Sequence, residues 1–389
     1  MKIAVITQYF PNSAQQWAGH SAYQTLRLLA RKHSVRVFYP ESRYPTLLTP
    51  KSRTHGRLDP NFQPDGVETT YIPYTALPLI SRPLNGWLIS QTLLPHVRTY
   101  APDIILNYVV YPDGYAAVRI GQKLNIPVVL TAIGSDLNRI SDAMCARHTK
   151  YALQHAAYTT TVSNDLLRTA HKLGANFDRS SAILNGCNTS IFHPMDRQIA
   201  REQLQVSLDT EVVVYVGRLD IRKGLVELVD SIAQLRDQRP SLHCYLVGDG
   251  PDKSLLETAI RTRNIGSQVH FVPACMTSRV AQWMAAADLI TLPSYNEGCP
   301  NVVIEALSSG RPVVATHVGG IPELVDNACG RLILPRDVKT LQTALNEVLN
   351  TAWNAEEIGA RFHRSWQDVA DELENVLEKT RHTYVCQAA

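Results

Sequence analysis

Short apolar segments alternate with amphipathic ones along this chain, and the alternation starts afresh at Val212. In the first half the apolar segments predict strands at Lys2–Thr7, Val35–Tyr39, Glu68–Pro73, Asp103–Tyr108, Pro127–Ala132, Thr159–Ser163 and Ser181–Asn185. The amphipathic segments predict helices at His20–Lys32, Pro83–Tyr100, Gly114–Leu124, Cys145–His155 and Asn164–Leu173. A strand followed by a helix, repeated many times, is typical of an α/β protein with a parallel, doubly wound sheet.

Two such runs within 389 residues predict two domains, each large enough to bury its own core. We expect one Rossmann-like domain at residues 1–190 and a second at 195–355, with Thr189–Arg197 as the linker. Residues 41–66 are rich in Pro, Arg and Ser without periodicity and predict a surface loop. The tail from Ala355 to Thr380 is predicted to be helical.

Composition limits the class of protein. With 45% hydrophobic and 19% charged residues, the chain is neither disordered nor collagen-like, and its net charge of +3 gives no reason to expect nucleic acid as a partner. The seven cysteines are dispersed without a CxxC pair, which favours reduced thiols in a cytoplasm over a disulfide framework. No apolar run approaches the ~20 residues of a membrane span, and the N-terminus predicts a strand, not a signal peptide. We therefore expect a cytoplasmic enzyme.

Two glutamates eight positions apart, Glu297 and Glu305, mark a candidate binding site. Glu297 lies in a polar loop after the predicted strand 287–293, and Glu305 lies about one turn into the predicted helix Asn301–Ser309. Ligands of open α/β sheets bind at the carboxyl ends of strands, and the start of a helix suits a phosphate. Carboxylates accept hydrogen bonds from sugar hydroxyls. The arrangement therefore predicts a sugar nucleotide.

Two basic residues, Arg218 and Lys223, form a second signal between the predicted strand Glu211–Gly217 and the helix that follows it. Arginine offers a planar fork and lysine a point charge, which together suit a diphosphate. A surface ion pair is the alternative for Arg218. The turn Gly248–Pro251 lacks the third glycine of a dinucleotide fingerprint, which argues against NAD.

In combination these segments resemble the family 4 glycosyltransferases, which have the GT-B fold. The likeness rests on the order and spacing of Gly217-Arg218-Leu219, Lys223-Gly224, Val247–Pro251, Ala286-Ala287-Asp288, Glu297 through Glu305, and Gly319–Glu323, and it is looser in the first half. It implies two facing Rossmann-like domains, the first for the acceptor and the second for the nucleotide-sugar donor. It also implies that a C-terminal helix, about residues 360–389, returns to the first domain.

The resemblance implies a retaining transfer from a nucleotide sugar, expected to be a UDP-sugar, to a saccharide or lipid-linked acceptor in bacterial envelope polysaccharide synthesis. The catalytic residues would be Arg218 and Lys223 on the diphosphate and Glu297 on the donor sugar, with Glu305 on the ribose. The remaining donor contacts would come from Gly19, Val272, Gly298, Cys299, Pro300, Asn301 and Val302. Gly19 also has a simpler interpretation, the start of a helix. No HxH, HExxH or DxD motif occurs, so neither a metal nor another cofactor is predicted.

On the acceptor side the sequence departs from the family. Many members have His-Gly-Ser-Asp where this chain has Ile133 to Asp136, and isoleucine can neither hydrogen-bond a sugar nor move a proton. We assign Asp113, Ser135 and Asp136 to the acceptor side. The departure leaves open a catalytically silent sugar-binding subunit. Two other enzymes also remain as alternatives, a nucleotide-sugar epimerase of the same fold and an NAD-dependent oxidoreductase.

The stretch Ser81–Arg98 predicts a helix with Leu84, Trp87, Leu88 and Leu94 spaced along it and Arg82 and Arg98 near its ends. Such a face suits a lipid head-group layer, which would make the enzyme peripheral at the inner face of a membrane. The alternative is that these side chains pack against the protein's own sheet.

Overall fold

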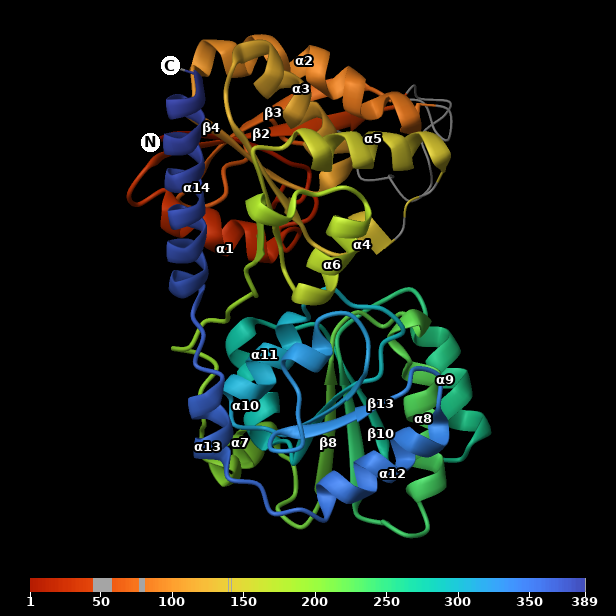
Figure 1. Ribbon diagram of the computed structural model, residues 1–389. Coiled ribbons are helices and arrows are strands. Elements are labelled where there is room, and N and C mark those ends of the chain that lie inside the picture. The colour runs from red at the N-terminus through yellow and green to blue at the C-terminus, as the bar shows by residue number, and fades with distance from the viewer. Residues whose placement is uncertain (45–57, 77–80, 139, 141, 389) are drawn as a thin grey trace. The chain divides into compact units, whose positions relative to one another are not determined.

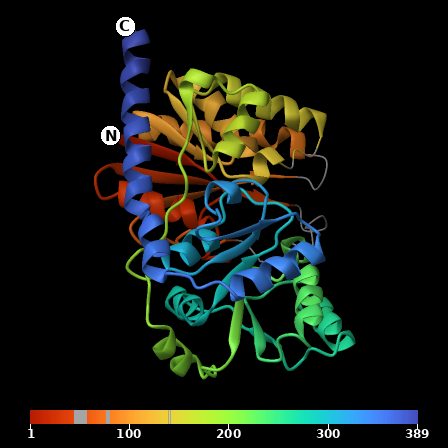
Figure 2. The same ribbon diagram turned by 60° about the horizontal axis from the view of Figure 1, so that its bottom comes forward.

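The computed structural model describes residues 1–44, 58–76, 81–138, 140 and 142–388 (Figure 1). The chain divides into two compact units, of which the first comprises Met1–Leu184 with Trp366–Ala389 and the second Asn185–Ser365. Each unit has a parallel sheet flanked by helices, as Figures 1 and 2 show. The predicted pair of Rossmann-like domains is thereby confirmed.

The sheet of the first unit has seven parallel strands in the order β3-β2-β1-β4-β5-β6-β7. Their bounds are β1 (Lys2–Ile6), β2 (Ser34–Arg43), β3 (Glu68–Thr75), β4 (Ile104–Tyr108), β5 (Val128–Ala132), β6 (Tyr158–Thr161) and β7 (Ser180–Ala182). The strand order reverses between the neighbours β1 and β4. The loops that follow their carboxyl ends are therefore the expected place for a ligand of this unit.

The helices of the first unit follow the predicted order. Their bounds are α1 (His20–Leu29), α2 (Asn85–Tyr100), α3 (Tyr115–Leu124), α4 (Ser135–Asn138), α5 (Ala143–His155), α6 (Asn164–Lys172) and α14 (Trp366–Ala388), with short turns η3 (Arg82–Leu84), η4 (Val110–Gly114) and η5 (Phe177–Arg179).

The C-terminal helix α14 belongs to the first unit, as expected. Its side chains Trp366, Val369, Leu373 and Leu377 are buried in the core cluster that also contains residues of β1, β4 and α1. Polar contacts add to this packing, because Glu374 accepts from Lys32 Nζ at 2.7 Å and lies 2.8 Å from His33 Nε2. Burial of a large apolar side chain contributes about 1.5–3 kcal/mol, so the apolar stripe provides most of the attachment.

The second unit has six parallel strands in the order β10-β9-β8-β11-β12-β13. The strands are β8 (Glu211–Val216), β9 (Leu242–Val247), β10 (Val269–Val272), β11 (Leu289–Leu292), β12 (Val313–Thr316) and β13 (Gly330–Ile333). The helices are α7 (Arg197–Leu204), α8 (Leu225–Leu235), α9 (Lys253–Thr262), α10 (Thr277–Ala286), α11 (Asn301–Ser308), α12 (Val338–Leu349) and α13 (Ala355–Arg361), with short turns η6 (Ile221–Lys223) and η7 (Ile321–Glu323). In this sheet the strand order reverses between the neighbours β8 and β11.

The strands and helices predicted in the first half are all present, with ends shifted by a few residues. The prediction of a loop at 41–66 is wrong at its start, because β2 continues to Arg43 and its residues 40–43 pair with 72–75 of β3. Most of the remainder, residues 45–57, lies outside the described part of the chain.

The tail from Ala355 to Thr380 is helical, as predicted, and consists of α13 and the larger part of α14. The two helices are separated at residues 362–365, where the N–H of Cys187 donates to the carbonyl of Arg364 and Cys187 forms an isolated β-bridge with Ser365.

No helix among the residues that the structure describes is both long and apolar enough to cross a lipid bilayer. No disulfide joins the seven cysteines, all of which lie in described segments.

Candidate functional site

Four loops meet at the carboxyl edge of the second unit's sheet, after β8, β9, β11 and β12. Their backbones touch: a Cβ atom on Gly224 would lie 2.0 Å from the carbonyl oxygen of Pro293, and one on Gly319 would lie 2.0 Å from that of Glu297. Both glycines also have positive φ, +70° and +56°. The loops that carry the predicted site residues are therefore fixed against one another.

Lys223 and Glu297, which are 74 residues apart in sequence, form an ion pair with Nζ 2.6 Å from Oε1. Lys223 ends η6 after β8, and Glu297 lies in the loop after β11, so the two residues meet where the strand order reverses. An ammonium group has three donors, and one bond to Glu297 leaves two for a ligand. The structure therefore brings together the residue predicted for the diphosphate and the residue predicted for the sugar.

Arg218 follows β8 directly and is exposed. Its guanidinium makes no hydrogen bond or ion pair with the residues that the structure describes, so the alternative of a surface ion pair finds no support. Its main chain is held, because the hydroxyl of Tyr215 donates to the Arg218 carbonyl at 2.8 Å. The nearby carboxylate of Asp220 bonds to Arg222 instead, and that hydrogen bond holds the pKa of Asp220 well below its usual range.

Glu305 lies in the second turn of α11 and is half-buried. Its carboxylate accepts no hydrogen bond within the described part of the chain, and burial raises its pKa to about 7. A carboxylate that is removed from water without a partner costs free energy in the ligand-free protein. A ligand that donates hydroxyl hydrogen bonds would offset that cost.

The segment 298–302 lies at the start of α11, and no side chain caps this helix. Asn185 holds the segment: its amide donates to the carbonyl of Cys299 at 3.2 Å and to the side-chain oxygen of Asn301 at 2.8 Å. The carbonyl of Gly298 accepts from the N–H of Gly320 at 2.7 Å. The uncapped N–H groups of α11 and its positive dipole end suit an anion. The donor contacts of Gly298, Cys299, Pro300, Asn301 and Val302 stay predictions.

Val272 ends β10, and its carbonyl accepts from the N–H of Gly248 at 2.9 Å. This bond joins the end of β10 to the loop after β9, at the same edge of the sheet. The ammonium of Lys253 lies 5.4 Å from the centre of the neighbouring Phe271 ring. The contact of Val272 with the donor stays a prediction.

Three further residues, Tyr295, Glu227 and Arg336, support the site, and no sequence pattern had pointed to them. The hydroxyl of Tyr295 donates to Oε1 of Glu227 at 2.7 Å, and the guanidinium carbon of Arg336 lies 4.6 Å from the centre of the Tyr295 ring. The N–H of Tyr295 also donates to the carbonyl of Arg222 at 3.0 Å. Tyr295 therefore joins the loop of Glu297 to the loop of Lys223, through contacts between segments far apart in sequence.

In the first unit Gly19 precedes α1 with φ +62°, and a Cβ there would lie 2.2 Å from the carbonyl oxygen of Tyr9. This close backbone approach is reason enough for a glycine. Its predicted contact with a diphosphate stays a prediction.

Both aspartates predicted for the acceptor side bind backbone amides of their own unit. Asp113 is buried, its Oδ2 accepts from the N–H of Gln8 at 2.6 Å, and burial raises its pKa to about 7. Asp136 accepts from the N–H groups of Ile133, Gly134 and Val110 at 3.1, 2.9 and 2.9 Å. The two carboxylates thus hold the loops after β1, β4 and β5.

A cavity of about 190 Å³ opens at the same edge of the first unit's sheet. It is lined by Arg82, Val109, Tyr111, Ser135, Asp136, Ile140, Cys145 and Thr149. The cavity therefore includes Ser135 and Asp136 from the sequence prediction but not Asp113. Ile133, which replaces the family histidine, packs against the core cluster instead.

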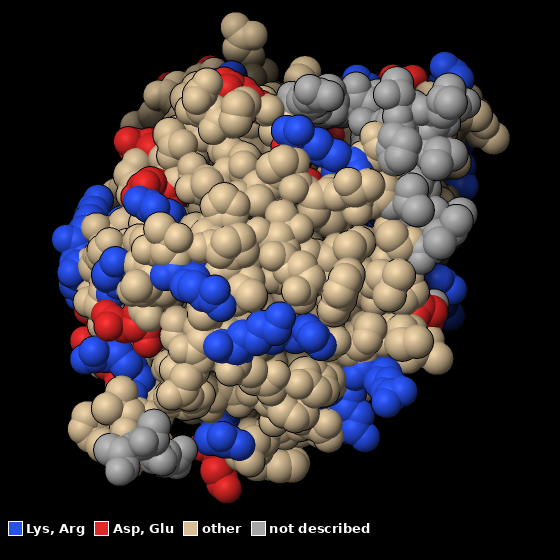
Figure 3. Space-filling view, turned by 90° about the horizontal axis from the view of Figure 1, so that it is seen from above, with Lys and Arg blue, Asp and Glu red and all other residues tan. Residues whose placement is uncertain are grey.

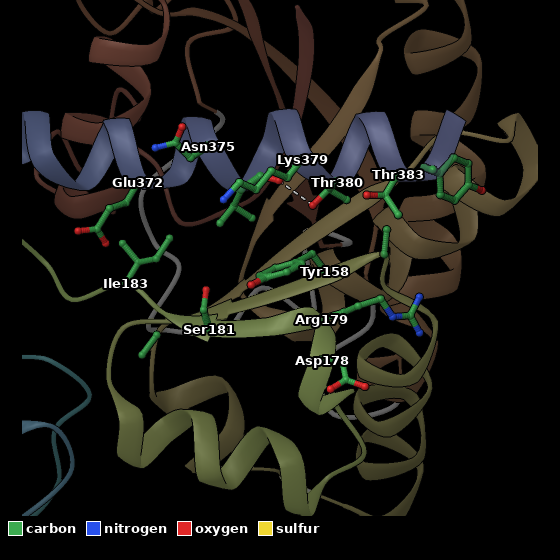
Figure 4. Close-up of a pocket in the computed structure, with 14 residues that line it drawn as sticks. Tyr158, Asp178, Arg179, Ser181, Ile183, Glu372, Asn375, Lys379, Thr380 and Thr383 are labelled. Carbon is green, nitrogen blue, oxygen red and sulfur yellow. Dashed lines mark hydrogen bonds between the residues drawn. The ribbon is translucent and has the colours of Figure 1, made fainter. Parts of the chain in front are cut away.

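A larger groove, of about 510 Å³, lies between α14 and the strands β6 and β7 (Figure 4). Tyr158 and Ser181 lie on the strand side, and Asn375, Lys379 and Thr380 lie on the helix side. None of the residues predicted for a site lines it.

Within the described ranges, one group of side chains has the spacing of a metal site: His33, Glu374 and Glu378 in the first unit. The ammonium of Lys32 already bonds to Glu374 there at 2.7 Å. These three side chains lie together because α14 packs onto the first unit. They are not part of the loops that carry the predicted site residues.

Comparison with known proteins identifies the family. The model described as glycosyl transferases group 1 matches residues 196–378, and that of glycosyltransferase family 4 matches residues 18–191. A putative teichuronic acid biosynthesis glycosyltransferase of Bacillus subtilis is 31% identical over 391 residues, covering 97% of this chain and 94% of that protein.

Solved structures agree on the fold. A sucrose-phosphate synthase from Thermosynechococcus elongatus aligns with a TM-score of 0.79 and 22% identity over 97% of this chain and 98% of its own. The HepE protein of Anabaena, solved in complex with UDP, aligns with a TM-score of 0.74 and 20% identity over 97% of this chain and 100% of its own. The chain is therefore a member of the family 4, group 1 glycosyltransferases.

Proposed function

We propose that this glycosyltransferase moves a sugar, with retention, from a UDP-sugar to a saccharide or lipid-linked acceptor during synthesis of an envelope polysaccharide. One observation carries the donor half of the proposal. The carboxyl edge of one sheet, where its strand order reverses, carries Arg218, Lys223, the uncapped start of α11 and Glu305, whose carboxylate has no partner among the described residues. The polymer is inferred from a relative named for teichuronic acid biosynthesis, and the nucleotide from a neighbour solved with UDP-glucose.

In the proposed reaction the bond between the sugar's C1 and the diphosphate breaks, and the acceptor oxygen bonds to C1 on the same face. The acceptor's proton passes to the departing diphosphate oxygen. Negative charge grows on the diphosphate as its bond breaks, so stabilisation by Arg218, Lys223 and the amides of α11 is greatest in the transition state. The protein supplies charge and positioning and no nucleophile.

In this proposal each of the two glutamates binds a different part of the donor. Glu305 would accept from the ribose hydroxyls, which are present in both UDP and the UDP-sugar. Glu297 would accept from hydroxyls of the transferred sugar, and the amide oxygen of a glutamine at this position can still accept the bond from Lys223. Titration calorimetry separates these roles, because Glu297→Gln is expected to weaken UDP-sugar binding and spare UDP, whereas Glu305→Gln weakens both.

We infer that the reaction needs no divalent metal, since two cations and a helix start already provide positive potential for the diphosphate. Protein treated with a chelator is expected to keep most of its transfer rate. If EDTA abolishes transfer and magnesium or manganese restores it, the model of the donor site is wrong.

The decisive experiment for the activity is a melting-temperature screen across sugar nucleotides, followed by product analysis with the ligand that stabilises the protein. Transfer to an added acceptor, with UDP release, supports the proposal. Conversion of the sugar nucleotide in the absence of acceptor would identify an epimerase. Binding without any turnover would identify a silent sugar-binding subunit.

We also propose peripheral membrane contact through the start of α2. Leu84 and Trp87 are 55% and 45% exposed, whereas Ile89, Leu93 and Val97 form the buried stripe of this helix. The view of the first unit in Figure 3 shows basic side chains set among uncharged ones. This arrangement suits an anionic lipid surface.

Co-sedimentation with anionic vesicles tests the membrane contact. Binding is expected at low salt, and it should fall when Leu84 and Trp87 are both replaced by serine. Leu255→Ser on α9 is the control, since that leucine is 46% exposed on the other unit. Wild-type protein that stays in the supernatant at low salt rules the contact out.

A further inference from the structure

We propose that the acceptor carries an acid group, a carboxylate or a phosphate ester, and that the cavity beside Arg82 binds it. The proposal rests on the transferase function proposed above and specifies its acceptor. It concerns the cavity of about 190 Å³ in the first unit, at the ends of β4 and β5.

The polar groups of the cavity that remain available are hydrogen-bond donors. Arg82 lines it, and its guanidinium has no hydrogen bond or ion pair with the described residues. The hydroxyls of Ser135 and Thr149 also line the cavity, and neither has a hydrogen bond among these residues. Donors of this kind call for a ligand rich in acceptor oxygens.

The acidic group in the cavity wall is already satisfied. Asp136 accepts three backbone N–H bonds, from Ile133, Gly134 and Val110. The hydroxyl of Tyr111 donates its hydrogen to the carbonyl of Arg82 at 2.6 Å. Arg82 is therefore the charged group of the wall that is left to meet a ligand, and its charge complements an anion.

The walls hold Arg82 in place. The hydrogen bond from the Tyr111 hydroxyl and the ring of Pro83 restrict the backbone at Arg82. Less backbone entropy is therefore lost when Arg82 binds a ligand. Val109, which also lines the cavity, has φ +78°, which is rare for a β-branched residue. Its conformation is fixed by bonds from its own N–H to Thr131 and from Gly114 to its carbonyl. Strained backbone of this kind is concentrated at ligand sites.

The size of the cavity sets the size of the group. A water molecule has a share of about 30 Å³ of liquid, and pockets for larger ligands run from about 300 Å³. A volume of about 190 Å³ suits one acid-bearing sugar unit or one phosphate ester, and not a length of polymer.

Binding measurements with the donor site filled by UDP test the proposal. Three probes are titrated into the UDP-saturated protein: a hexuronate, a hexose 6-phosphate and the neutral hexose. We expect the neutral hexose to bind at least tenfold more weakly than one of the acids. Arg82→Ala is expected to remove that preference, a loss of about ten- to a hundredfold for a charge-assisted bond. The two acids distinguish a carboxylate acceptor from a phosphorylated one.

Arg98→Ala is the matched control, because Arg98 is an exposed arginine on α2 that does not line the cavity. Arg82→Lys keeps the charge and should retain part of the preference. Equal binding of acid and neutral probes to the wild type overturns the proposal, as does an undiminished preference in Arg82→Ala. UDP affinity is measured on every variant, so failure of the donor site appears separately from failure of this one.

Discussion

Glu305→Gln is expected to stabilise the ligand-free protein above neutral pH and to weaken donor binding. The carboxyl group has no hydrogen-bond donor within the described residues, and burial raises its pKa from 4.5 to about 7. Glutamine has the same shape without the charge. The substitution therefore removes the cost of an ionised group that is half-buried without a partner among these residues.

The magnitude follows from the difference between the two pKa values. A span of about 2.5 pH units corresponds to at most about 3 kcal/mol. Because the pKa is raised in the folded state, the folded protein holds a proton between pH 4.5 and 7 that the unfolded chain has released. Stability from this group is therefore present below pH 4.5 and is lost as the pH rises to 7. The glutamine variant has no proton to release at this position, so its stability does not fall in this way as the pH rises.

Calorimetric melting at pH 5 and pH 8 checks the prediction. A change of 1 kcal/mol shifts melting by about 2–4 °C in a unit of this size, so the variant is expected to melt several degrees higher at pH 8. At pH 5 the difference should nearly vanish. Glu257→Gln on α9 serves as the control and is expected to change the melting temperature at neither pH.

Donor binding should move in the opposite direction. A UDP-sugar is a better ligand for this test than UDP, because its diphosphate is esterified at both ends and does not titrate near neutrality. We expect its affinity for the variant to fall about tenfold. A variant that is less stable than wild type at pH 8, or that binds the donor as well as wild type, would refute the assignment of Glu305 to the ribose.

Four further changes test the geometry of the donor loops. Arg218→Ala and Lys223→Ala should each lower transfer about ten- to a hundredfold, and Arg218→Ala should leave the melting temperature unchanged because its guanidinium has no bond to any described residue; wild-type kinetics in both would remove them from the diphosphate site. Gly319→Ala places a Cβ 2.0 Å from the carbonyl oxygen of Glu297 and should displace that loop and abolish most transfer, whereas Gly266→Ala, with nothing within 4 Å, should be neutral. Tyr295→Phe loses the bond to Glu227 and should reduce kcat/KM several-fold with little change in melting temperature; unchanged kinetics would show that the bond does not position the loop.

The fold and half of the site could be predicted because both depend on short-range patterns. Each strand is followed closely by its helix, so periodicity alone revealed two parallel sheets. Arg218 and Lys223 follow one strand, and Glu297 and Glu305 follow another. Their chemistry was therefore readable from the segment that contains them.

The rest depended on contacts between distant segments. Lys223 meets Glu297 across 74 residues, and Tyr295 meets Glu227 across 68, because the carboxyl ends of neighbouring parallel strands share one edge of the sheet. The cavity beside Arg82 combines the start of one helix with the ends of two strands.

The sequence by itself therefore determined the α/β class, the two runs of strands and helices, and the residue types available to a diphosphate and to sugar hydroxyls. The tertiary structure decided which of those residues are free. Asp113 and Asp136 are bonded to backbone amides, while the side chains of Glu305 and Arg82 have no hydrogen bond with any residue that the structure describes. Whether a polar side chain is satisfied depends on groups brought to it by packing, which no local pattern encodes.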